Sequence, residues 1–324
     1  MLLQLGCGSK KIDERSGLMN ILIKELKQFK KNRELFLIGL PAMLMLFIVA
    51  YLPMGGLIIA FKNYTYDKGI FGSDWVGLDN FKFFFTSQDA LRVTRNTLLL
   101  NGAFIILGLA ISVIVAVMLN EISRRTAKLY QTMMFVPYFI SFVVVGYLTY
   151  ALLSPEYGVI NAILKSLSIP SVDWYGDPVY WPVILIITYL WKNVGYLAII
   201  FYTGILGIDV SYHEAASIDG ATKLQQIKHI TIPLLQPLII LMFILNVGKI
   251  FYSDFGLFYF IPRDLGILYP ATDVIDTYVY RSLRVLGDMG MASAAGFYQS
   301  IVGFILVITS NLIVKKINEE NAIF

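Results

Sequence analysis

The chain has 324 residues, of which 57% are hydrophobic and only 15% charged, and its formal net charge is +4. Soluble domains carry about 25% charged residues, so this composition excludes an ordinary soluble globule. The single cysteine, Cys7, excludes an intramolecular disulfide framework. The apolar residues come in blocks of about 20, the length of a helix that crosses ~30 Å of hydrocarbon. A membrane protein is therefore expected.

Six apolar segments are long enough to cross a membrane. In hydrocarbon only helices and closed barrels satisfy the backbone, and these segments are too long and too uniformly apolar for barrel strands. The sequence therefore predicts an all-α membrane domain over residues 35–316, between an N-terminal segment, 1–34, and a tail, 317–324. The six predicted spans are approximately 35–61, 97–119, 129–153, 179–206 (interrupted by Lys192 and Asn193), 234–260 and 294–314.

The flanking charges predict the orientation of these spans. With an even number of spans, the N-terminal segment, the second loop, the fourth loop and the tail share one side of the membrane. These four segments hold 15 basic residues, and the three opposite segments hold 9. Because cytoplasmic segments carry an excess of Lys and Arg, both termini are expected in the cytoplasm.

The loop between the fourth and fifth spans, residues 209–233, is unusually long for a helical membrane protein. Ser211 is expected to cap a first short helix over 214–219, because Glu214 three residues later completes a capping box. Gly220 supplies a permissive turn. A second helix is expected over 221–230, and Pro233 begins the fifth span. Spacing alone would also allow a hairpin that only lies on the membrane.

Three segments carry a family resemblance. Glu214-Ala215-Ala216, with Gly220 six residues after the glutamate and then Ile-x-Ile-Pro ending at residue 233, resembles the EAA loop of ABC importer permeases; the family has Leu where Ile232 stands. The continuation to Asp219-Gly220-Ala resembles the carbohydrate branch. Residues 51–64 and 75–81 are similar to the outer segment of maltose-importer-type permeases, in the subgroup for polysaccharide-derived oligosaccharides. The resemblance covers residues 20–320.

This resemblance implies a type I ABC importer permease fold with six transmembrane helices, in the inner membrane of a bacterium, working by alternating access. The implied partners are a second homologous permease subunit, two cytoplasmic ATPase subunits, an extracytoplasmic substrate-binding protein and the lipid bilayer, with no nucleic acid. ATP and Mg would be bound by the ATPases, with no cofactor or metal in this chain and no catalytic role. The implied ATPase-coupling residues are Glu214, Ala215, Ala216, Asp219 and Gly220.

The residues expected to line the substrate pathway are polar and aromatic side chains within the fourth and fifth spans. Ionisable groups inside a membrane are costly and default to functional candidates, and aromatic rings with amides and ammonium groups suit sugars. Lys192 and Lys249 favour an acidic oligosaccharide such as an alginate fragment. The candidates are Tyr189, Trp191, Lys192, Asn193, Tyr196, Asn246, Lys249 and Ser253.

Other interpretations of the same residues stay open. Either lysine could pair with Asp254 or with a partner subunit, and Asn193 and Asn246 could simply join helices. Two rival functions are an ABC permease for a non-sugar solute and an ion-coupled secondary transporter. A third rival, a polytopic enzyme, needs a set of reactive groups at one membrane face. The only histidines, His213 and His229, have no cysteine beside them and are expected to be surface residues rather than metal ligands.

Overall fold

The computed structural model describes residues 31–317, so Cys7, most of the predicted N-terminal segment and almost all of the predicted tail lie outside the described residues. The chain divides into two units, with the boundary after Ile58. The first span is helical throughout: α2 (Arg33–Leu46) continues through a π-helical turn, η1 (Phe47–Tyr51), and a 3-10 helix, η2 (Leu52–Phe61). Its large apolar side chains are mostly exposed, as expected of a surface that meets lipid.

The second unit, from Ile59 onward, is predominantly helical. Its long helices are α5 (Gln88–Glu121), α6 (Arg124–Phe139), α9 (Trp181–Leu206), α12 (Ile232–Val247) and α16 (Met289–Ile317). The shorter helices are α3 (Gly69–Gly72), α4 (Asp79–Thr86), α7 (Phe142–Leu153), α8 (Val159–Ser166), α10 (Val210–Ile218), α11 (Lys223–Gln226), α13 (Phe255–Phe260), α14 (Tyr269–Thr272) and α15 (Ile275–Arg284). One two-stranded antiparallel sheet pairs β1 (Lys62–Asn63) with β2 (Asp74–Trp75).

Five helical segments of the described chain are long and apolar enough to cross a membrane, or six if the pair α6 and α7 counts as one. That pair replaces the predicted third span and is bent by 98°. Pro137 lies in the last turn of α6, and the Ser141 hydroxyl caps α7 by accepting the Val144 amide at 3.4 Å. A proline followed by a fresh N-cap ends one helix and begins another.

The fourth and fifth spans compare differently with the prediction. Lys192 and Asn193, which interrupt the apolar run of the fourth span, both lie inside one continuous helix, α9. The prediction that the fifth span runs to residue 260 was wrong, since α12 ends at Val247. After an irregular segment, α13 begins where the Asp254 carboxylate caps the Gly256 amide at 3.1 Å. The apolar run that continues through these residues belongs to two elements, not one.

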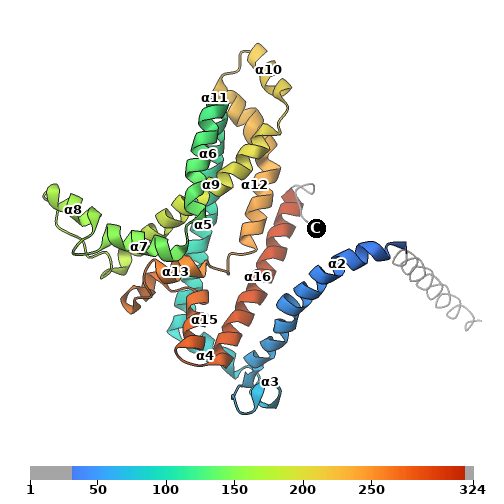
Figure 1. Cartoon of the computed structure of the whole chain (residues 1–324), viewed down its shortest axis with the longest axis vertical. Helices are drawn as coiled ribbons and strands as arrows, with labels where there is room; N and C mark the ends of the chain where they lie inside the picture. The colour runs from blue at the N-terminus through green and yellow to red at the C-terminus, as the bar shows by residue number, and fades with distance from the viewer. Residues whose placement is uncertain (1–30, 318–324) are drawn as a thin grey trace, which may run out of the picture. The chain divides into compact units, whose positions relative to one another are not determined.

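The second unit has a core on each side of its middle. Toward one end, α5 packs on α9 and α12 through Leu109, Ala116, Phe201 and Leu235. Toward the other, Phe104 of α5 packs with residues of α7, α9 and α13, including Trp181, which is fully buried. The hairpin of α10 and α11 lies at the first end of this unit, and α4 and α15 lie at the opposite end (Figure 1).

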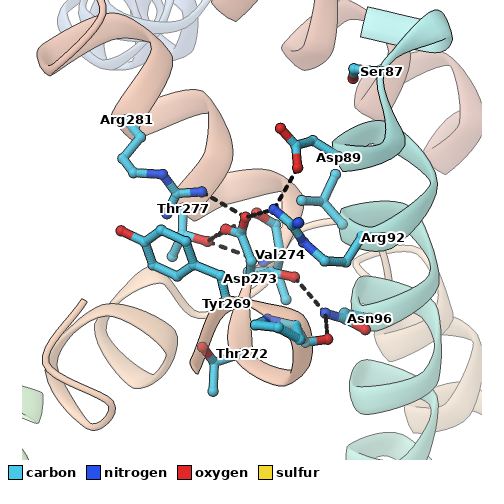
Figure 2. A network of polar contacts seen from close by, with 12 residues as sticks. Ser87, Asp89, Arg92, Asn96, Tyr269, Thr272, Asp273, Val274, Thr277 and Arg281 are labelled. Atoms are coloured by element: carbon cyan, nitrogen blue, oxygen red, sulfur yellow. Dashed lines mark hydrogen bonds and ion pairs between the residues drawn. The ribbon is translucent and has the colours of Figure 1, made fainter. Parts of the chain in front are cut away.

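A buried polar network fastens that opposite end (Figure 2). Asp273, which is 1% exposed, accepts Arg281 of α15 at 2.6 Å and Arg92 of α5 at 3.2 Å. Asn96 of α5 donates to the Asp273 backbone carbonyl at 3.0 Å, and Thr277 donates to its carboxylate at 2.8 Å. The network therefore joins segments 181 residues apart in the sequence.

Candidate functional site

The loop between α9 and α12 forms a hairpin of two short helices, as predicted, but it begins differently. The Asp209 carboxylate, not Ser211, caps α10, and it accepts the Ser211 amide at 2.9 Å. The predicted capping box of Ser211 with Glu214 was wrong, because the helix already starts at Val210 and Glu214 lies inside it. Hydrogen bonds from Ser211 lower the pKa of the Asp209 carboxyl, so this cap stays ionised at neutral pH.

Gly220 makes the turn of the hairpin, as expected. Its φ of +80° lies in the left-handed region, where a Cβ is unfavourable. The Ala221 amide donates to the Ala216 carbonyl at 2.9 Å and the Gly220 amide to the Ser217 carbonyl at 3.1 Å, which is the Schellman pattern of a glycine-terminated helix. The Asp219 amide donates to the Ala215 carbonyl at 3.0 Å. The glycine therefore closes α10 and reverses the chain.

The second arm of the hairpin has its own cap. Thr222 and Gln225 form a reciprocal capping box at the start of α11, which continues through a π-helical turn, η4 (Ile227–Thr231), into α12. Gln226, which is 5% exposed, donates to the Ser217 hydroxyl at 2.9 Å and to the Ala221 carbonyl at 3.2 Å. This side chain holds the two arms at a set distance.

The hairpin exposes the side chains that another protein would contact. Glu214, Ala215, Asp219 and Gly220 are exposed, and Ala216 is half-buried. Within residues 31–317, no ion pair uses Glu214. Exposed apolar side chains are concentrated here too, with Ile218 87% exposed. A cavity of about 370 Å³ opens between the arms, lined by Ala216, Asp219, Gly220, Ala221, Gln225, Gln226, His229 and Ile230.

A second candidate site is a cavity of about 150 Å³ beside the end of α12, lined by residues of α5, α9 and the segment before α13. It brings together three of the predicted pathway residues, Tyr189, Asn246 and Lys249. The Tyr189 ring stacks on Phe104 with centroids 4.3 Å apart and planes 7° from parallel. We name this the central cavity; its full lining is Asn101, Phe104, Ile105, Tyr189, Asn246, Lys249, Ile250, Tyr252 and Asp254.

The polar groups of the central cavity differ in the hydrogen bonds and ion pairs that they already make within the protein. Asn246 donates to the Met242 carbonyl at 2.7 Å, which leaves its amide oxygen available. Lys249 is exposed, and within the described residues its ammonium is in no ion pair. A stacked aromatic wall, an amide and a lysine are a chemically suitable lining for a hydroxylated or acidic ligand.

The remaining predicted pathway residues lie elsewhere. Lys192, 6% exposed, turns toward the break between α6 and α7. Asn193 donates to the Tyr189 carbonyl of its own helix at 3.0 Å, and Tyr196 stacks on Tyr138 of α6 at 4.7 Å. Trp191 is 46% exposed, and Ser253 accepts Asn101 at 2.9 Å just outside the cavity. These predicted pathway residues therefore contact several different neighbours and do not line one cavity.

Asn101 is an amide-bearing residue of the cavity that sequence reasoning missed. It donates to the Ile250 carbonyl at 2.7 Å and so holds the irregular segment after α12 against α5. The signal was present, because Asn101 is an amide inside an otherwise apolar predicted span. Within residues 31–317 there is no group of three or more His, Cys, Asp or Glu side chains that could hold a metal ion.

Comparisons with known proteins agree with one another. Residues 105–319 match the family described as binding-protein-dependent transport system inner membrane component. Protein LplB of Bacillus subtilis (strain 168) is 33% identical over 92% of this chain and 93% of its own length. The polygalacturonan/rhamnogalacturonan transport system permease protein YteP of the same organism is 31% identical over 93% and 92%. A crystal structure of a bacterial ABC transporter involved in import of the acidic polysaccharide alginate superposes with a TM-score of 0.83 at 31% identity, covering 91% of this chain and 99% of that one.

Proposed function

The chain belongs to the family of inner membrane components of binding-protein-dependent transport systems, and from this we propose that it is the permease subunit of an ATP-driven importer for acidic oligosaccharides. The family relation confirms the predicted permease class, the inner membrane and the binding protein as partner. It leaves the ion-coupled secondary transporter without support, because such a transporter needs no binding protein of this kind.

The observation that carries the coupling role is the hairpin of α10 and α11. Its exposed Glu214, its glycine-closed turn and its cavity form a compact surface that projects from one end of the second unit (Figure 1). We infer that this surface docks on an ATPase subunit, with Glu214 facing a basic group. The hairpin and both termini then lie in the cytoplasm, where the basic flanks also place them.

If the hairpin docks on an ATPase, ATP hydrolysis and transport are carried out by different subunits. ATP and Mg would bind to two partner ATPases, and this chain would hydrolyse nothing. Residues 31–317 contribute at most six spans, too few to enclose a path for an oligosaccharide, so a second homologous permease subunit completes the pathway.

The acidic substrate is supported by chemistry and by similarity. Lys249 presents a cation to the central cavity beside the Tyr189 ring. Two of the similar proteins are named for uronate-containing polymers, polygalacturonan and alginate. An ammonium group in a poorly hydrated pathway offsets the carboxylates of such a ligand more strongly than it would in bulk water.

The test is ATPase activity and uptake in liposomes by the complex of this chain with its partner subunits and binding protein. Acidic oligosaccharides are compared with the same oligosaccharides after reduction of the carboxyl groups to alcohols. We expect the acidic form to stimulate ATPase activity and Glu214→Ala to abolish that stimulation or to release the ATPase during purification. Stimulation by a non-sugar solute alone would replace the oligosaccharide with the rival ABC substrate, and co-purification of no ATPase would end the importer proposal.

A further inference from the structure

A second cavity, of about 240 Å³, lies between α7 and α13 and is separate from the central cavity. The two helices approach closely at Gly146, where a Cβ would come within 2.6 Å of the Phe260 carbonyl oxygen. We name it the α7–α13 cavity. Its lining is Val143, Gly146, Tyr147, Tyr150, Tyr259, Phe260, Arg263 and Asp264.

Three tyrosines line the cavity, and neighbouring rings hold Tyr150 and Tyr259 in place. The Tyr150 ring meets Tyr175 edge-on at 5.5 Å. Tyr259 stacks on Phe255 at 4.9 Å and meets Tyr280 edge-on at 5.3 Å. Tyr147 is 71% exposed at the rim. Rigid rings with hydroxyl groups at their edges suit the apolar face and the hydroxyls of a sugar.

Arg263 gives the cavity a positive group with a free edge. Its guanidinium lies over the Tyr150 ring, 4.3 Å from the centroid, so one face is covered and the N–H edge remains available. Within residues 31–317 it is in no ion pair. The neighbouring carboxylate, Asp264, is already engaged, because it accepts the Tyr269 hydroxyl at 3.0 Å and lies 3.5 Å from Arg281.

The cavity lies at the end of the second unit where α9 begins. Tyr175, which contacts Tyr150, also packs against Trp181 at the first turn of α9, with centroids 5.0 Å apart. The hairpin follows the last turn of the same helix. In the proposed orientation this end faces the outside, where a substrate arrives.

We propose that the α7–α13 cavity binds one uronate unit of an incoming oligosaccharide. The carboxylate takes the free edge of Arg263 in a two-pronged ion pair, and the sugar ring lies among the three tyrosines. The volume is below that typical of drug-sized ligand pockets, which suits a single sugar unit rather than a chain. The site rests on the proposed function, since it needs an acidic saccharide as substrate.

The test is equilibrium binding of a fluorescently labelled tetra-uronide to the complete complex in lipid nanodiscs, without binding protein, followed by anisotropy. All variants carry Lys249→Met, which removes the cation of the central cavity. Adding Arg263→Gln is expected to raise the dissociation constant roughly 10- to 100-fold, the loss that goes with a hydrogen-bonded charge. Arg263→Lys should recover part of the affinity, because it keeps the charge but not the planar fork.

Arg284→Gln is the matched control, since it removes the same charge from an exposed position on α15 that does not line the cavity. It is expected to change the dissociation constant by less than about twofold.

Equal losses in Arg263→Gln and Arg284→Gln would indicate general charge attraction and overturn the inference. Unchanged binding in Arg263→Gln would also overturn the inference. The same holds if the Lys249→Met complex binds no tetra-uronide while the wild type transports it. If the wild-type complex transports only neutral sugar, the proposed function fails instead. Should Arg263→Gln not assemble, Arg263→Lys and Tyr150→Phe carry the comparison, and full affinity in Arg263→Lys would count against a two-pronged pair.

Discussion

The Lys192 side chain already uses its ammonium group in hydrogen bonds within the protein. Its ammonium donates to the carbonyls of Pro137 at 3.2 Å, Tyr138 at 2.8 Å and Ile140 at 2.5 Å. These carbonyls lie at and just after the end of α6, where helical backbone donors run out. The Pro137 carbonyl also accepts the Ile140 amide at 3.2 Å. One three-donor group satisfies all three, so Lys192 stabilises the sharp turn between α6 and α7.

Replacing Lys192 by Met is therefore expected to lower stability. It leaves the partly buried Tyr138 and Ile140 carbonyls without this donor, at a cost of ~1–3 kcal/mol for each group that finds no other partner. The measurement is the melting temperature of the purified complex, followed by tryptophan fluorescence. Lys249→Met is the control, because that exposed lysine makes no such bonds, and it should reduce uptake of acidic oligosaccharide with little change in melting temperature. Lost uptake in Lys192→Met at an unchanged melting temperature would instead return Lys192 to the substrate pathway.

Gly220 is a residue whose backbone conformation limits which side chains can replace it. No atom lies within 4 Å of a Cβ built there, so a substitution is limited by its φ of +80° and not by space. Gly220→Val should cost roughly 1–2 kcal/mol or more in the hairpin, because a β-branched residue is poorly tolerated in the left-handed region. Gly220→Asn should cost less, since Asn visits that region. The measurement is the amount of ATPase that co-purifies; equal retention by both variants would show that the turn geometry is irrelevant to docking.

Among the elements, α6 and α9 are joined by a backbone contact that only glycine permits. A Cβ at Gly195 of α9 would lie 1.9 Å from the carbonyl oxygen of Met134 in α6. Gly195→Ala must therefore push the helices apart, and an overpacked core of this kind costs ~1–3 kcal/mol. Gly102→Ala in α5 is the matched control, because nothing lies within 4 Å of its Cβ. Thermal unfolding of the two variants should separate them; equal melting temperatures would mean that α6 is free to shift.

Sequence patterns predicted most elements but not where two of the spans break. Hydropathy finds the apolar run through residues 129–153 and the run after 234, yet it does not register Ser141 or Asp254 as N-caps that begin new helices. The hairpin could be predicted because its residues are local and lie at fixed spacing. The central cavity could be predicted only in part, because Asn101 reaches Ile250 across 149 residues of sequence, and no local pattern reports which helices pack together.

At the scale of the second unit, the network around Asp273 joins α5 to the segment before α15 at the end opposite the hairpin (Figure 2). One buried carboxylate serves two guanidinium groups, and Arg281 also lies over the Tyr269 ring at 4.0 Å. Burial lowers the pKa of the Arg281 guanidinium, but the hydrogen bond to Asp273 and the charge of its carboxylate outweigh burial, and the pKa stays above its ordinary value. The arginine therefore remains charged at every working pH. The network thus depends on the negative charge of Asp273.

Removing that charge should destabilise the whole unit more than any surface ion pair does. Asp273→Asn takes from Arg281 its nearest counter-charge, which leaves only Asp264 at 3.5 Å, and leaves Arg92 with Asp89 alone at 2.7 Å. Breaking a buried pair costs about 3–5 kcal/mol. The matched control is Asp79→Asn, which breaks an exposed pair with Lys82 whose side chains are 65% and 75% exposed and which should cost about 0–1 kcal/mol. Both variants are compared by thermal unfolding of the purified complex. Adding Arg281→Gln to Asp273→Asn should recover part of the loss, because it removes a guanidinium that has lost its nearest counter-charge. A double variant that is only the sum of its parts would mean that Arg281 and Asp273 stabilise the molecule independently, and that their ion pair adds nothing to the network.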